Sequence, residues 1–344
     1  MPADAGGATL TTLSVDVGGT HARLALVRDG LIVARDTRRT TDLAGSDHDV
    51  TTDLVDAACA LAERAVARSE PYPAAVGVSL AAAVDFAGSV LQPREFGIPA
   101  GTRVRDAFAA AFGVPVPVDN DANLAALAEA RFGAARGCRS VAVITIGTNI
   151  GLGLVFDGAV HRGANGAAGE IGLTLVPATP VGRSADGRAV VDAGCLGRAV
   201  AAGPSGYAFI EDLVGGAALA AAARAAGIET RAVLSDAARD PHLTAIVDRA
   251  VEGWALVIAN LAVVLDLDRV VVTGSLAQDA AHLLDRLRAR VAELVSFAPE
   301  IRLGSVGPDA ELLGADLLAR AALASRVDPN ARAGLSAQSR GEDR

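Results

Sequence analysis

The hydrophobic positions in the first part of the chain form short apolar runs, separated by glycine-containing turns and by segments of helical spacing. The apolar runs predict five strands, over residues 10–17, 22–27, 31–36, 75–80 and 114–118. The segments of helical spacing are rich in alanine and predict three helices, over residues 51–69, 104–112 and 122–132. Asp29-Gly30, between two of the strands, is typical of a hairpin turn.

The second part of the chain begins with the same kinds of element and then becomes mostly helical. Four further apolar runs predict strands, over residues 140–146, 151–156, 269–273 and 301–305. Helical spacing predicts helices over residues 196–202, 216–226, 232–239, 243–265, 279–295 and 310–324. Strands that alternate with helices indicate an α/β protein. Residues 327–344 are polar, and we expect them to be disordered.

One supersecondary unit occurs twice along the chain, at residues 10–36 and at residues 140–162. Each copy consists of a strand, a turn of small residues, a second strand and an Asp-Gly hairpin turn. The small-residue turns are Gly18-Gly19-Thr20 and Gly147-Thr148-Asn149, and such turns let backbone amides approach a phosphate closely. We interpret the two copies as an internal duplication that offers two phosphate-binding turns, although chance similarity between two ordinary hairpins is the alternative.

Composition excludes several classes of protein. The formal net charge of −9 disfavours a nucleic-acid-binding surface. The chain contains no lysine, which excludes a Walker-type phosphate loop and Schiff-base chemistry. The three cysteines, Cys59, Cys138 and Cys195, are odd in number and far apart, which favours a reducing, cytoplasmic compartment. We find neither a secretory signal nor an apolar stretch that would span a membrane.

Acidic and amide side chains stand where predicted strands end. Asp16 ends the first strand and could hold a hydrated Mg²⁺, and Arg23 follows the first turn as a possible cation for phosphate. Asn120 and Asp121 lie between a strand and a helix, where Asp121 can face a cleft and Asn120 can bond a substrate hydroxyl. Ordinary capping of the helix would also explain both residues.

Two further segments have the composition of binding loops. The glycine-rich segment 163–172 contains Glu170, which could accept hydrogen bonds from hydroxyls, although a solvated loop carboxylate is the alternative. Gly274-Ser275 follows a predicted strand and could pass beside a base or a ribose, although a plain strand-to-helix turn would look the same.

In this order, the segments resemble the ROK family of bacterial sugar kinases and repressors, from about residue 12 to residue 325. VDVGGTHARLAL resembles the first phosphate motif of the family, and VDNDANLAALAEARFGAARG resembles its substrate and catalytic motif. ITIGTNIGLGLVFDGAVHRGANGAAGEIG resembles the second phosphate motif and the sugar loop. VVTGSL and LGSVGPDAELLGADLLA resemble the adenosine-side and C-terminal segments.

The resemblance implies a two-lobed actin-like ATPase fold, related to ribonuclease H, with a central cleft. We expect a small lobe over residues 9–118, on which the helix 309–325 packs, and a large lobe over residues 119–308. The implied reaction is transfer of the ATP γ-phosphoryl group to a sugar hydroxyl, usually the primary one, in a homodimeric enzyme.

The resemblance also assigns roles to individual residues. Asp121 would be the catalytic base, and Asp16 would place Mg²⁺ through water. The residues that would contact the sugar are Asn120, Glu170, Asn165 and Gly166. The residues that would bind ATP are Gly18, Gly19, Thr20, Arg23, Gly147, Thr148, Asn149, Gly274 and Ser275.

The sequence departs from the family pattern on the sugar side. Members usually bind a structural zinc through a His after the sugar-loop Glu and through three Cys, but here Leu173 replaces that His. Cys195 aligns with the last Cys, whereas Arg188 and Val190 occupy the other two positions, and one thiol cannot form a tetrahedral zinc site. We therefore predict that the protein binds no structural zinc and that Cys195 is a small buried residue.

These departures widen the choice of acceptor. Gly197 replaces a second sugar-binding Glu, and Leu80-Ala81-Ala82-Ala83 replaces the usual Gly-x-Pro-Gly loop. A hexose or sugar-like molecule is one expectation, and a modified sugar or a C7-cyclitol, phosphorylated on its primary hydroxyl, is the alternative. Two other functions compete with a kinase. A repressor would need a helix-turn-helix segment before the first strand, which we do not find, and the retained carboxylates argue against a non-catalytic sugar-sensing protein.

Overall fold

The computed structural model describes residues 10–43, 50–92, 97–177, 207–228, 233–234 and 241–327. Three predicted segments lie wholly or mostly outside these residues: the helix at 196–202, the helix at 232–239, and the disordered tail from residue 328.

The chain divides into two compact units. Unit 1 comprises Met1–Arg131, Val155–Ala168 and Asp309–Arg344, and unit 2 comprises Phe132–Leu154 and Gly169–Pro308. Residues 119–131 and 155–168, which fall in the expected large lobe, group with unit 1 in this division.

The first five strands form a mixed sheet in the order β3-β2-β1-β4-β5. Its strands are β1 (Thr11–Val17), β2 (His21–Arg28), β3 (Leu31–Arg39), β4 (Val76–Leu80) and β5 (Val118–Asn120). The pairs β1–β2 and β2–β3 are antiparallel, whereas β4 runs parallel to both β1 and β5. The ends of β1, β4 and β5 therefore reach the same edge of the sheet, which is where ligands bind in parallel α/β sheets.

A second five-stranded sheet has the order β12-β11-β6-β7-β8. Its strands are β6 (Ser140–Ile146), β7 (Ile150–Phe156), β8 (Ala159–Val160), β11 (Arg269–Thr273) and β12 (Glu300–Leu303). Taken in the opposite direction, this order is β8-β7-β6-β11-β12. It matches the first sheet, in which three consecutive strands are also followed by two later ones. This shared topology agrees with the duplication predicted from the sequence.

The hairpins form where the Asp-Gly pairs predict them. Asp29 and Gly30 both have positive φ, of 50° and 81°, and Asp157 and Gly158 have φ of 49° and 79°. Positive φ at both central residues is the requirement of a type I′ turn, whose twist matches that of the flanking strands. Local sequence therefore determines the register of both hairpins.

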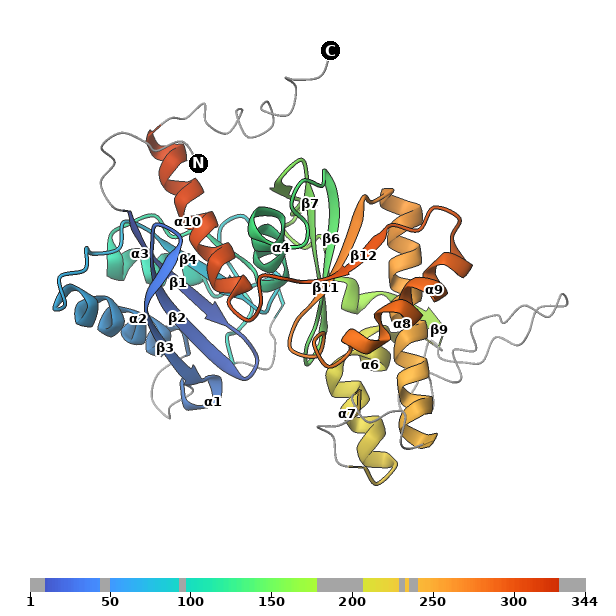
Figure 1. Cartoon of the computed structure of the whole chain (residues 1–344). Helices are drawn as coiled ribbons and strands as arrows, with labels where there is room; N and C mark the ends of the chain where they lie inside the picture. Colours follow the sequence, from blue (N-terminus) through green and yellow to red (C-terminus); the bar gives the residue numbers. More distant parts are fainter. Residues whose placement is uncertain are drawn as a thin grey trace, which may run out of the picture. The chain divides into compact units, whose positions relative to one another are not determined.

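Helices pack on the first sheet to form the core of unit 1. The helices of this unit are α1 (Thr40–Leu43), α2 (Val50–Val66), α3 (Val104–Phe112), α4 (Asp121–Phe132) and α10 (Ala310–Val327). The helix α10 contacts β1 and β4, as predicted for the C-terminal helix (Figure 1). Every residue of β1 is buried, and Leu13, Val15 and Val17 lie in a hydrophobic cluster with residues of β2, β4, α2 and α3.

Unit 2 contains the remaining described helices. They are α6 (Glu211–Val214), α7 (Gly216–Ala225), α8 (Pro241–Leu265) and α9 (Leu284–Leu294), with short 3₁₀ turns at Ile171–Leu173 and Ala281–Leu283. The strands β9 (Leu175–Pro177) and β10 (Tyr207–Phe209), which the sequence did not predict, form a small antiparallel pair. None of the helices described in the structure is long and apolar enough to cross a membrane.

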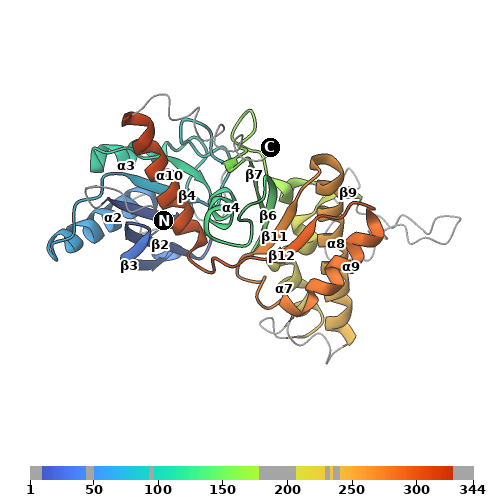
Figure 2. The same ribbon diagram turned by 45° about the horizontal axis from the view of Figure 1, so that its top comes forward.

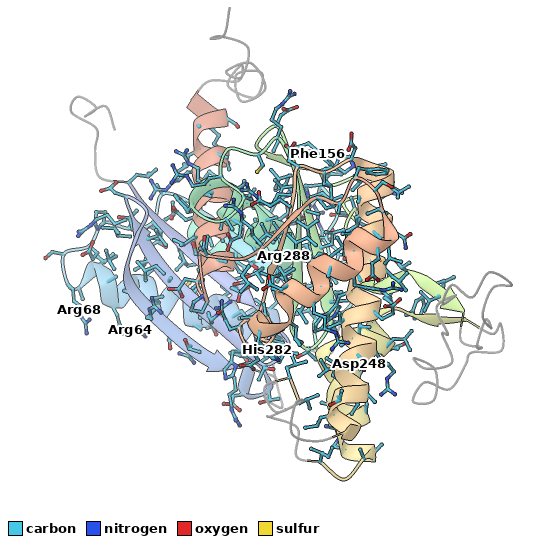
Figure 3. The ribbon with its side chains drawn as sticks, turned by 45° about the vertical axis from the view of Figure 1, so that its right-hand side comes forward. Arg64, Arg68, Phe156, Asp248, His282 and Arg288 are labelled. Carbon is cyan, nitrogen blue, oxygen red and sulfur yellow. The ribbon has the colours of Figure 1, made fainter. Side chains whose placement is uncertain are left out.

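The helices α8 and α9 lie side by side in unit 2 (Figure 2). Arg286 of α9 pairs with Asp248 of α8 at 2.6 Å, and Arg290 pairs with Glu252 at 2.7 Å. Figure 3 labels Asp248 on α8 and, on α9, Arg288, which is two residues after Arg286. The two pairs lie one helical turn apart along both helices.

Candidate active site

Asn120 and Asp121 lie in unit 1, where β5 ends and α4 begins. The Asn120 side-chain oxygen accepts hydrogen bonds from the amides of Ala122 at 2.9 Å and Asn123 at 3.3 Å. Asn120 is therefore the N-cap of α4, as the capping interpretation expected. Its amide nitrogen donates to the Ala82 carbonyl at 3.2 Å. Asp121 is half buried, and its Oδ1 accepts from the Ala122 amide at 2.7 Å, so its carboxylate lies at the positive end of the helix.

Asp119, which the sequence analysis did not select, is a buried carboxylate at the same strand end. Its Oδ1 accepts from the Asn120 amide at 2.8 Å and from the Asn123 side chain at 2.9 Å. Its Oδ2 lies 3.1 Å from Nε of Arg162, which follows β8. Burial raises the pKa of Asp119, and the positive charge of Arg162 offsets part of that rise. A polar residue at the end of a buried strand was the available indication of this role.

Asp16 ends β1 and shares a cation with a second carboxylate. Its Oδ2 accepts from Nε and Nη2 of Arg23, at 3.0 and 2.7 Å, and its Oδ1 accepts from the Ser79 hydroxyl at 2.7 Å. Nη2 of Arg23 also donates to Glu311, in the first turn of α10, at 2.9 Å. Burial opposes the charged form of Arg23, but Asp16 and Glu311 raise its pKa overall. Arg23 thus orients Asp16. The phosphate-binding role that the sequence suggested for Arg23 stays a prediction.

Gly18, Gly19 and Thr20 form the turn between β1 and β2, as predicted. The Gly18 amide donates to the His21 carbonyl at 3.0 Å, and a Cβ added at Gly19 would meet no atom within 4 Å. Thr40 holds the turn from the protein side. Its hydroxyl donates to the Gly18 carbonyl at 2.9 Å, and its amide donates to the Thr20 carbonyl at 3.0 Å. The exposed side of the turn therefore remains open to a ligand.

The predicted sugar loop is divided between the two units. In unit 1, Asn165 is exposed, whereas Gly166 is buried with φ of 82°. A Cβ at Gly166 would lie 2.2 Å from the Val84 carbonyl oxygen, so only glycine fits against that segment. In unit 2, Glu170 is half buried and immediately precedes the 3₁₀ turn that contains Leu173. The described structure therefore brings Asn165 and Gly166, but not Glu170, into the unit of Asn120 and Asp121.

Unit 2 contains a pocket of about 290 Å³. It is lined by Gly147, Thr148, Gly216, Ala217, Leu219, Ala220, Val233, Leu234, Ser275, Leu276 and Asp279. Three of the predicted ATP-binding residues are therefore brought together, and Asn149 belongs to the same exposed turn. Gly274 has φ of 99°, and a Cβ there would lie 2.6 Å from the Ile146 carbonyl oxygen.

The pocket also contains residues that sequence reasoning missed. The amides of Gly216 and Ala217, at the start of α7, donate to the carbonyls of Gly147 and Thr148 at 2.9 and 2.8 Å. The lining combines apolar residues such as Leu219 and Leu234 with the glycines and hydroxyl residues of the turns, and it includes one acidic residue, Asp279. An apolar wall beside polar turns suits a nucleotide, whose base is flat and whose phosphates accept hydrogen bonds. The Gly-Gly pair before an alanine-rich helix was the available indication.

The residues present fit Mg²⁺ and ATP. Three hydrogen bonds fix the orientation of the Asp16 carboxylate and occupy part of both oxygens, which suits contact with Mg²⁺ through water rather than directly. The residues of the predicted zinc site, from Arg188 to Gly197, lie outside the described residues, so the absence of zinc stays a prediction. Among the described residues, no group of three or more His, Cys, Asp and Glu side chains could hold a metal, and Cys59 and Cys138 are free.

Solved structures of sugar kinases have the same fold. A ROK hexokinase from Thermus thermophilus gives a TM-score of 0.72 at 29% identity, covering 92% of this chain and 100% of that chain. A ROK family glucokinase from Streptomyces griseus, in complex with glucose and AMPPNP, gives 0.69 at 26% identity and covers 90% and 99%. These likenesses and the two sheets confirm the predicted α/β class of actin-like ATPases.

Curated relatives and a family profile match most of the chain. The bifunctional enzyme NanE/NanK of Brucella melitensis is 32% identical over 312 residues, which are 89% of this chain and 54% of that protein. The chain thus spans about half the length of this relative. The N-acetylmannosamine kinase of Vibrio cholerae is 28% identical over 317 residues, which are 89% of this chain and 98% of that protein. The ROK family profile matches residues 12–322, and the chain belongs to the ROK family.

Proposed function

We propose that the protein is an ATP-dependent kinase that transfers the γ-phosphoryl group to a hydroxyl, the primary one, of a hexose or a sugar-like molecule. The observation that carries this proposal is the position of Asp121. Its carboxylate lies at the end of β5, in the unit that also holds Asp16 and the turn at Gly18–Thr20. Three relatives or structural neighbours are named as glucokinase, hexokinase and N-acetylmannosamine kinase, which supports the same reaction class.

In the proposed reaction Asp121 is the general base. The acceptor hydroxyl loses its proton to Asp121 while its oxygen forms a bond to the γ-phosphorus. The bond between that phosphorus and the β,γ-bridging oxygen breaks, and ADP leaves. The hydrogen bond from the Ala122 backbone amide to Oδ1 of Asp121 keeps the carboxylate oriented to receive the proton. Most of the rate enhancement would come from positioning and from stabilised charge.

The two units would have different tasks in this reaction. The pocket of unit 2 would bind ATP, with the base along the apolar wall and the phosphates at the Gly147–Asn149 turn. Unit 1 would bind the acceptor through Asn120, Asn165 and Gly166. Asp16 would hold Mg²⁺ through water, and the ion would neutralise charge on the phosphates. Glu170, in unit 2, would bond an acceptor hydroxyl.

The acceptor is the finer part of the proposal. Leu173, beside Glu170, offers no polar group where family members carry a His. A pocket that lacks a polar partner discriminates differently among hydroxyl patterns. We propose a hexose as the acceptor because the relatives named above are hexose or amino-sugar kinases. The altered pocket is the reason for a second candidate, a modified sugar or a C7-cyclitol. A homodimer and a cytoplasmic location, expected from the resemblance and the cysteines, stay proposals.

A coupled assay of ADP release tests the proposal. The protein would be supplied with Mg-ATP and, in turn, glucose, N-acetylmannosamine, fructose, allose and a C7-cyclitol, with Asp121→Ala as the control. We expect one acceptor to stimulate ADP release, loss of that stimulation in the variant, and a phosphate monoester in the ³¹P NMR spectrum of the product. Binding of ATP without turnover of any acceptor would contradict a kinase and favour a sugar-sensing protein.

A further inference from the structure

We infer that Arg162 is a positioning residue that fastens the acceptor-side segments 82–86 and 162–166 to the strand end carrying Asp121. The inference rests on the proposed function, because it concerns how the acceptor is held. It goes beyond that function by assigning a task to a buried ion pair that the reaction itself does not use.

Arg162 makes four contacts with its planar guanidinium group. Its Nε lies 3.1 Å from Oδ2 of Asp119. Its Nη2 donates to two consecutive backbone carbonyls, that of Val84 at 3.1 Å and that of Asp85 at 3.2 Å. The guanidinium carbon lies 4.8 Å from the centre of the Phe86 ring, which is a cation–π contact. One side chain therefore holds three consecutive residues of the 82–86 segment.

The other partner of Arg162 is Asp119, which is two residues before the proposed base Asp121 on the same strand end. Asp119 is 3% exposed, and its second oxygen bonds the Asn120 amide and the Asn123 side chain. The Asn120 side chain in turn donates to the Ala82 carbonyl. The 82–86 segment is thus joined to the strand end twice, through Asn120 and through Arg162. Any shift of Asp119 would move the backbone of Asn120 and, with it, Asp121.

The sugar loop packs against the same carbonyl that Arg162 binds. Gly166 approaches the Val84 oxygen so closely that an added Cβ would lie 2.2 Å from it. The Ala168 amide donates to the Arg162 carbonyl at 3.1 Å, which closes the loop on itself. Arg162, Val84 and Gly166 therefore form one contact point between the two acceptor-side segments. All of these residues belong to unit 1.

The charge of the pair also requires an explanation, because buried ion pairs contribute little stability for their cost of desolvation. The side chains of Arg162 and Asp119 are only 19% and 4% exposed. Replacing such a pair with apolar residues often leaves stability unchanged. The pair instead supplies geometry, since a guanidinium carries its donors on three nitrogens, so that Nε faces the carboxylate while Nη2 bonds both carbonyls, whereas an ammonium carries all its donors on one nitrogen.

Steady-state kinetics of the full chain tests the inference. The informative variant is Arg162→Lys, which keeps a positive charge but carries its donors on one nitrogen, so it cannot face Asp119 and bond both carbonyls as Nε and Nη2 do. We expect the KM for the acceptor to rise about tenfold or more, or kcat to fall similarly, with the KM for ATP unchanged within about twofold. Arg162→Gln should have a larger effect. Arg28→Gln is the matched control for Arg162→Gln, because it removes a pair in which Nη1 of Arg28 contacts both carboxylate oxygens of Glu70, at the end of β2 that pairs with the first residue of β1.

The outcomes separate this inference from the proposed function. If wild-type protein turns over an acceptor but Arg162→Lys only lowers the melting temperature, with both KM values and kcat unchanged, the pair is merely structural and the inference is wrong. An equal rise of the KM for ATP and for the acceptor would also overturn it. If the wild type turns over no acceptor, the proposed function fails first and the inference fails with it. For variants that fold poorly, the double variant Arg162→Gln/Asp119→Asn removes both charges. A positioning role predicts that it regains melting temperature but not acceptor affinity.

Discussion

The amide of Gly216 donates to the carbonyl oxygen of Gly147 over 2.9 Å, and a Cβ added at Gly216 would lie 2.2 Å from that oxygen. This contact joins the start of α7 to the turn after β6, and both line the pocket of unit 2. No side chain fits there without moving the turn. The shape of the pocket therefore depends on the absence of one methyl group.

Gly216→Ala should abolish tight nucleotide binding. The methyl group would push the Gly147–Asn149 turn away from α7 and open the polar side of the pocket. Calorimetric titration with Mg-ADP would measure the effect, and we expect an affinity loss of about tenfold or more. Gly137→Ala is the control, because its φ of 80° makes it strained although no atom lies within 4 Å. Equal affinity losses in the two variants would show that general destabilisation, not pocket shape, is responsible.

Thr40→Val should weaken ATP binding without touching the nucleotide. Valine keeps the shape of threonine but removes the hydroxyl that donates to the Gly18 carbonyl, and the site is buried. We expect a loss of about 1 kcal/mol in unfolding free energy and a severalfold rise in the KM for ATP. Urea unfolding and initial rates would measure the two effects. Thr41→Val, at an exposed neighbour whose hydroxyl donates to Asp42, should change neither quantity. An unchanged KM in Thr40→Val would contradict the role of this turn.

Glu311→Gln should alter how stability depends on pH. Burial and the negative charge of Asp16 raise the pKa of Glu311, and the charge of Arg23 opposes this rise. Folding therefore disfavours charged Glu311, and this cost is absent below its unfolded pKa of about 4.3 and complete above its raised folded pKa. The variant is neutral throughout, so its melting temperature relative to wild type should increase as pH rises from about 4 to about 8.

Melting curves at several pH values would check this expectation. Glu293→Gln is the control, since Glu293 is 66% exposed in its pair with Arg290. Its difference from wild type should vary far less with pH. A Glu311→Gln difference that falls as pH rises would contradict the account that burial and Asp16 outweigh Arg23 at this carboxylate, because it would mean that the charged form stabilises the fold.

The sequence predicted best where the structure depends on neighbouring residues. The Asp-Gly turns and the strand Ser140–Ile146 agree with the residue ranges expected, since turn chemistry and apolar runs are local. The strand expected at 114–118 was placed too early, because β5 is Val118–Asn120. Pro115 and Pro117 have no amide hydrogen, although their carbonyls accept from Val76 and Val78, so the paired strand begins only after them.

The sequence allowed individual candidate residues to be selected, but not the contacts between them. Asp16, Asn120 and Asp121 were recognisable because polar residues followed apolar runs. The contacts of Arg162 with Asp119 and of Arg23 with Glu311 join segments far apart in the chain, and no local pattern indicates such pairs. The same reason explains why the β9–β10 pair was missed. Long-range pairing depends on the whole fold, which a pattern of single residues does not contain.

The most direct test of the account is the acceptor-dependent rate of ADP release in Asp121→Asn. Asparagine can still accept the Ala122 amide bond through its oxygen, so the start of α4 should be preserved while the base is lost. We predict that kcat falls by about 10²- to 10⁴-fold, with Mg-ADP affinity and melting temperature near those of wild type. A variant that folds, binds nucleotide and turns over the acceptor at the wild-type rate would contradict the assignment of Asp121 as the base.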